Sequence, residues 1–149
     1  DAGTEDAVVS VIQAFTATEL QNHKYTSGYS ASVTNPANWE THWNSTVNPN
    51  PVTRPVANKT CAGQSCSLPT DGVGNTVTYT IERLCQTIGD PLLSPTGCVS
   101  GGQAAALTGN SLGSGSNQPS QLTQYYYRVT SRIDGPRNTV TYIQSIVAK

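Results

Sequence analysis

The segment NWETHWN at residues 38–44 holds the densest group of side chains that could bind a ligand. Its two indole rings, Trp39 and Trp43, are large amphipathic surfaces of the kind that stack against a sugar or anchor a partner protein. Tryptophan is also highly buried on average, so the alternative is that one ring fills the core and the other covers it. The burial alternative has the greater weight, and both tryptophans remain a candidate binding surface.

A second candidate surface lies near the C-terminus. Tyr126, Arg128 and Arg132 alternate with more apolar positions in the sequence YYYRVTSRI, which places the three on one face of an extended strand. Such a face is ordinarily a solvated one. The functional alternative is a polar packing surface for a neighbouring subunit.

The four cysteines occur as Cys61-x4-Cys66 and Cys85-x12-Cys98. Four cysteines allow three pairings, and the sequence alone does not choose among them. We favour Cys61–Cys66 with Cys85–Cys98, because each of these bridges closes a short loop at low entropy cost. Structural disulfides would place the chain in an oxidising, extracytoplasmic compartment.

The sequence offers little for metal binding or catalysis. Neither cysteine spacing is C-x2-C, and His23 and His42 do not form a pair with the spacing of zinc ligands. The nucleophile, metalloprotease and phosphate-binding motifs G-x-S-x-G, H-E-x-x-H and G-x-x-x-x-G-K-[ST] do not occur. We therefore expect a protein that is not an enzyme, with no catalytic residues, no metal site and no cofactor.

The composition limits the class of partner. The 149 residues carry a net charge of -1 and only 11% charged residues, while Thr, Ser, Asn and Gln hydrate the surface. A nucleic acid is not expected as the main ligand, because neutralising phosphates needs a basic face. The sequence has no run of about 18 apolar residues that could cross a membrane.

The elements that must position these residues follow from periodicity. Val8, Val11, Ile12 and Phe15 recur at helical spacing, which predicts a helix over residues 1–24. Strict alternation predicts a strand over 75–85 and a hairpin over 124–147. Frequent Pro and Gly predict two long irregular segments, a loop over 26–74 and a disulfide-tethered, Gly/Ser-rich loop over 86–121.

The hairpin has a predicted register. If Asp134 lies opposite Arg137 across the DGPR turn, Val129 lies opposite Tyr142, and the apolar residues of both strands share one face. One helix and such a sheet predict a single domain over 1–149 of α+β class. Its helix would pack on an antiparallel sheet of about three to five strands with long irregular loops.

The two ends of the chain resemble a known family. The opening AGTEDAVVSVIQAF is similar to the second, soluble half of the long N-terminal helix in PilX-type minor pilins of bacterial type IV pili. The closing YYRVTSRIDGPRNTVTYIQSIV resembles the C-terminal strand pair of the same proteins. The prepilin leader and the apolar first half of that helix are absent, and the chain has no Met. We therefore expect a soluble, N-terminally truncated domain.

The resemblance implies a pilin-like fold and a structural role in pilus assembly, with adhesion or twitching motility as connected functions. Its implied partners are other pilin and minor pilin subunits and a tip adhesin. It further implies insertion of the full-length protein into the inner membrane through the missing helix half, and an extracellular location after assembly. The alternative function is a secreted carbohydrate- or protein-binding module that uses Trp39 and Trp43.

Overall fold

The computed structural model describes residues 2–47, 54–56, 59–62, 64–93, 96–101 and 123–149. The strands, in chain order, are β1 (Tyr29–Ser30), β2 (Arg54–Val56), β3 (Lys59–Ala62), β4 (Ser65–Ser67), β5 (Thr76–Arg83), β6 (Ser100–Gly101), β7 (Gln124–Gly135) and β8 (Thr139–Ala148). The helices and helical turns are α1 (Ala2–Ala7), η1 (Val8–Ile12), η2 (Glu19–Gln21), η3 (Tyr25–Ser27), α2 (Trp39–His42), η4 (Trp43–Val47) and η5 (Pro136–Asn138).

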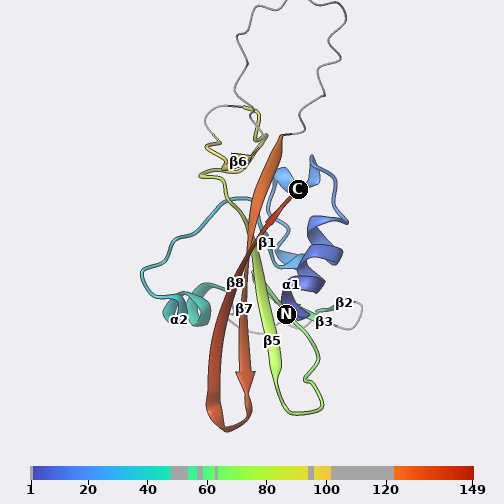
Figure 1. Ribbon diagram of the computed structural model, residues 1–149, viewed down its shortest axis with the longest axis vertical. Helices are drawn as coiled ribbons and strands as arrows, with labels where there is room; N and C mark the ends of the chain where they lie inside the picture. The colour runs from blue at the N-terminus through green and yellow to red at the C-terminus, as the bar shows by residue number, and fades with distance from the viewer. Residues whose placement is uncertain (1, 48–53, 57–58, 63, 94–95, 102–122) are drawn as a thin grey trace, which may run out of the picture.

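These elements form an α+β fold around one sheet. The strands run in the order β2-β3-β4-β5-β7-β6, with β1 added to β5 and β8 added to β7. All pairs are antiparallel except β1 with β5. Figure 1 shows α1 and α2 on opposite sides of the long strands β5, β7 and β8.

The sheet is wider than the expected three to five strands, because the predicted loop over 26–74 is wrong. This segment contains β1 to β4 and α2, all four residues long or shorter. Elements that short have no measurable periodicity. β1 and β4 pair directly with β5, β3 pairs with β4, and β2 pairs with β3. The Gly/Ser-rich part of the predicted loop over 86–121 lies outside the described residues.

The predicted helix over 1–24 is too long. α1 and the π-helical turn η1 end at Ile12, and the next helical turn begins at Glu19. Thr16 and Glu19 bond reciprocally, with Thr16 N donating to Glu19 Oε2 at 2.9 Å and Glu19 N to Thr16 Oγ1 at 3.3 Å. This is a capping box, which starts a new helical turn rather than continuing the old one.

One core lies between α1 and the sheet. The helix presents Gly3, Ala7, Val11 and Ile12 as its buried side, while Phe15 is only partly buried. The sheet and the neighbouring turns contribute the other buried apolar residues of this cluster, Leu20, Tyr29, Ala31, Cys61, Cys66, Tyr79, Ile81, Tyr127 and Val129. The core therefore depends on tyrosine rings from several strands as much as on the helix.

The hairpin β7–β8 exists, but its predicted register is wrong. Gly135 pairs with Thr139, and Val129 lies opposite Ser145 rather than Tyr142. The turn is three residues long, with Arg137 and Asn138 in the left-handed region at φ 64° and 58°. A shift of three residues reverses the faces of β8, because side chains alternate along a strand.

Candidate functional site

The segment that carries both tryptophans lies on the face of the sheet opposite α1. Asn38 caps α2, since its Oδ1 accepts a hydrogen bond from Thr41 N at 3.0 Å. Asn is a favoured N-cap because its side chain satisfies a free amide of the first turn. The cap starts the helix just before Trp39, so that Trp39 and Trp43 are four residues apart and lie on the same side of α2 and η4.

Trp39 lies beside Arg128, which the sequence had placed in a separate candidate surface. The Arg128 guanidinium carbon is 5.1 Å from the centre of a Trp39 ring. Its Nη2 also forms an ion pair with Glu82 Oε2 at 2.6 Å, and Glu82 is almost fully buried. The guanidinium further donates to Thr34 O and to Asn35 Oδ1, so Arg128 fastens the chain before α2 to the sheet.

Trp43 is a core residue, which contradicts its role in an exposed platform. It is 1% exposed and meets the ring of Tyr142 edge-on, with the ring centres 6.0 Å apart. A ligand could reach only Trp39, which is partly buried itself. The burial alternative for this tryptophan pair is therefore correct, and a two-tryptophan sugar platform is excluded.

Arg132, four residues after Arg128 on β7, contacts the same helical segment at η4. It binds Asp134 Oδ1 through Nε at 3.0 Å and Nη2 at 2.8 Å, and its Nη1 donates to Asn44 Oδ1 at 2.9 Å. Tyr126 shares this strand face but packs next to Gly101, where a methyl group would lie 2.2 Å from its hydroxyl. The predicted candidate surface thus contains one contact region around α2 and a separate contact at β6.

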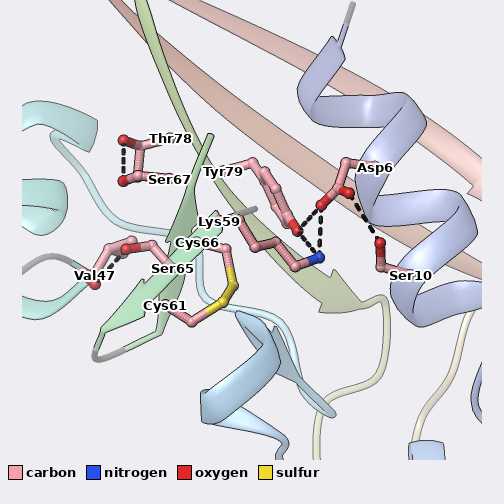
Figure 2. Close-up of a disulfide and its surroundings, with 10 residues drawn as sticks. All are labelled: Asp6, Ser10, Val47, Lys59, Cys61, Ser65, Cys66, Ser67, Thr78 and Tyr79. Atoms are coloured by element: carbon pink, nitrogen blue, oxygen red, sulfur yellow. Dashed lines mark hydrogen bonds and ion pairs between the residues drawn. A yellow bond between two sulfur atoms is a disulfide. The ribbon is translucent and has the colours of Figure 1, made fainter. Parts of the chain in front are cut away.

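The other face of the sheet carries a polar cluster that sequence analysis missed. Asp6 on α1 accepts hydrogen bonds from Lys59 Nζ at 2.7 Å, from Ser10 Oγ at 2.9 Å and from the hydroxyl of Tyr79. Lys59 Nζ also donates to the Tyr79 hydroxyl at 3.0 Å. Figure 2 shows how these side chains from α1, η1, β3 and β5 point toward one another. The sequence contained one signal for this cluster. Tyr79 is on the inward face of the alternating strand, and a buried tyrosine hydroxyl needs a polar partner.

Protonation in this cluster follows from its bonds. Burial alone would raise the pKa of Asp6, but the hydrogen bonds from Lys59, Tyr79 and Ser10 outweigh it and lower that pKa. Burial and the hydrogen bond to Asp6 raise the pKa of Tyr79 well above its ordinary value. Asp6 therefore stays ionised and Tyr79 neutral at physiological pH. The two groups attach α1 to the sheet, and neither is poised to exchange a proton.

Both predicted disulfides are present. Cys61–Cys66 joins directly opposed residues of the hairpin β3–β4, and not the irregular segment that we expected (Figure 2). Cys85–Cys98 closes the tract that follows β5. Arg83, which is buried, supports this tract because its Nη2 donates to Gly89 O at 2.8 Å.

The described residues contain no group of three or more His, Cys, Asp or Glu side chains that could hold a metal ion. No helix within the described ranges is long and apolar enough to cross a membrane. His23 accepts a hydrogen bond from Ala31 N at 3.1 Å, and burial together with the nearby Arg83 lowers its pKa.

Comparisons with protein-family models, curated proteins and solved structures found no match, so a function must be inferred from these residues themselves.

Proposed function

We propose that the chain is the globular domain of a minor pilin, a non-enzymatic structural subunit of a bacterial type IV pilus. The observation that carries the proposal is that the two resembling ends of the chain pack on each other. α1 lies against β5 and β7, and Thr4 Oγ1 donates to Ser145 Oγ of β8 at 3.3 Å. The similarity in sequence thus belongs to one physical unit of the fold.

The C-terminal residue strengthens this unit. Lys149 Nζ donates to Ile12 O and to Phe15 O, each at 2.5 Å, at the end of the helical segment. Cations stabilise the carbonyl end of a helix, where several carbonyl oxygens have no partner within the helix. These bonds hold the end of the helical segment against the C-terminal strand, which supports a single pilin-like unit of helix and sheet.

Two further features support the proposal. The segment containing α2 lies between α1 and β5 along the chain, at the place of the variable loop of a pilin. In space it covers the face of the sheet opposite α1 (Figure 1). Two disulfides suit an oxidising compartment outside the cytoplasm. The partners in this proposal are other pilins, other minor pilins and a tip adhesin, with the full-length protein in the inner membrane before assembly.

The proposal is tested by deleting the gene in the native bacterium and counting surface pili by electron microscopy. We expect fewer pili and reduced adhesion or motility, restored by the intact gene, and we expect the protein in the sheared pilus fraction. Normal piliation, adhesion and motility, with the protein absent from that fraction, would refute a pilus role.

The gene itself offers an independent check. A minor pilin requires about 20 apolar residues directly before Asp1, behind a short basic leader. A cleavable secretory signal with an A-x-A site at that place would indicate a freely secreted protein instead.

A further inference from the structure

β8 is a long edge strand. It has ten residues, and among the strands that the structure describes it pairs with β7 alone. Tyr125 and Lys149 exchange both backbone hydrogen bonds, at 2.8 and 2.9 Å. Because hydrogen-bonded and non-hydrogen-bonded pairs alternate in an antiparallel ladder, odd-numbered residues of β8 bond toward β7. The amides and carbonyls of Val140, Tyr142, Gln144 and Ile146 therefore point outward.

In the described part of the chain, the β8 edge lacks the charged residues, prolines and bulges that ordinarily discourage pairing. The strand TVTYIQSIVA contains no charged residue and no proline, and its register with β7 runs without a bulge. Natural proteins ordinarily shield such edges with lysine, proline, bulges or a covering segment. Three large apolar side chains are exposed on it, Val140 at 43%, Ile143 at 41% and Ile146 at 58%.

We propose that β8 pairs with β8 of a second copy of this chain, antiparallel and centred on Ile143. The three exposed apolar residues are spaced evenly, three apart, so a two-fold axis at Ile143 places Val140 of each copy opposite Ile146 of the other. The same register places Tyr142 opposite Gln144. All of these facing residues have outward amides and carbonyls, so the hydrogen-bond pattern and the apolar pattern agree on one register.

The remaining geometry is compatible with a second copy. Ile143 lies on the α1 face, opposite Ser131, whereas Val140 and Ile146 lie on the α2 face, opposite Asp134 and Arg128. Pairing would therefore cover apolar side chains on both faces of the joined sheet. In this register only uncharged residues of β8 face each other, so the strand itself brings no like charges together. Other partners would need a matching neutral strand, whereas a second copy supplies one by symmetry.

The inference is tested by the concentration dependence of the molar mass, measured by sedimentation equilibrium on the 149-residue chain. A single strand pair is a small interface, so we expect association at micromolar concentrations or above. The molar mass should rise from 15.7 kDa toward twice that value. A mass that stays at one chain up to about 1 mM, or that grows without limit, would overturn the proposal.

A charge at the symmetry axis should prevent the pairing. Ile143→Lys places two ammonium groups opposite each other, and we expect at least a tenfold loss of affinity, because like charges directly opposed destabilise a strand pair. Val73→Lys is the matched control, since Val73 is 73% exposed in the turn before β5. Equal association of both variants, each folded by circular dichroism, would contradict the proposed interface.

Cross-linking tests the register without a charge change. Ile143→Cys should form a disulfide between two copies under mild oxidation, because residue 143 faces itself across the axis. Ser145→Cys should not, because residue 145 faces residue 141 of the other copy. Efficient cross-linking of Ser145→Cys, or none with Ile143→Cys, would refute the register. None of these measurements depends on a role in the pilus.

Discussion

Replacing Trp43 by alanine should strongly destabilise the protein. Trp43 is 1% exposed and fills the space between α2 and the sheet, and its truncation leaves a large cavity. Buried Trp→Ala substitutions cost about 3–5 kcal/mol, to which the lost edge-on contact with Tyr142 contributes about 0.5–1.5 kcal/mol. In a domain of this length that corresponds to a fall in Tm of roughly 6–20 °C.

Trp39→Ala is the matched control, because it removes the same side chain four residues earlier. Trp39 is only partly buried, and its contact with Arg128 is worth about 0.5–1 kcal/mol. Urea denaturation with the disulfides intact, followed by circular dichroism, should therefore give a much smaller loss for Trp39→Ala. In Trp39→Phe, the fluorescence of the remaining Trp43 should resist quenching by acrylamide. Equal losses for the two alanine variants, or a readily quenched Trp43, would refute the inferred burial.

Three further predictions concern the attachments of the helix and the strands. Folding lowers the pKa of Asp6, so ionised Asp6 stabilises the folded state above its ordinary pKa of 3.8, and this stabilisation is lost as the pH falls through the folded value. Asp6→Asn should therefore flatten the acid dependence of stability, measured as the urea midpoint from pH 2 to 7. Gly3→Ala should destabilise by about 1–3 kcal/mol, because the new methyl would lie 2.6 Å from Ser131 Oγ, whereas Gly72→Ala meets no atom within 4 Å and should be neutral. Removing the Cys85–Cys98 bridge by paired serine substitutions should cost about 3 kcal/mol in chemical denaturation, since it closes a loop with a sequence separation of 13.

The candidate binding residues show how far local pattern could lead. Tyr126, Arg128 and Arg132 were expected on one strand face, and β7 places them there. Their partners could not be foreseen, because Glu82, Asn44 and the chain before α2 reach them only through the tertiary fold. For the same reason, the sequence could suggest that one tryptophan is buried but not which one.

The sequence by itself determined the elements whose signal is local. The alternation over 75–85 predicted β5, the alternation over 124–147 predicted the β7–β8 pair, and short loop closure predicted both disulfides. The capping box of Thr16 and Glu19 is also a local signal, and it marks the start of a new helical turn within the predicted helix over 1–24.

Only the tertiary structure decided the rest, because the deciding energies come from contacts distant in sequence. The strands β1 to β4 are too short for a pattern, and they join the sheet through β1 and β4, which pair with β5. The hairpin register depended on the left-handed backbone of Arg137 and Asn138, which a turn signal alone does not reveal. The Asp6–Lys59–Tyr79 cluster joins three elements across more than fifty residues of chain. The burial of these polar groups and the hydrogen bonds that compensate for it exist only after the helix and the sheet have come together.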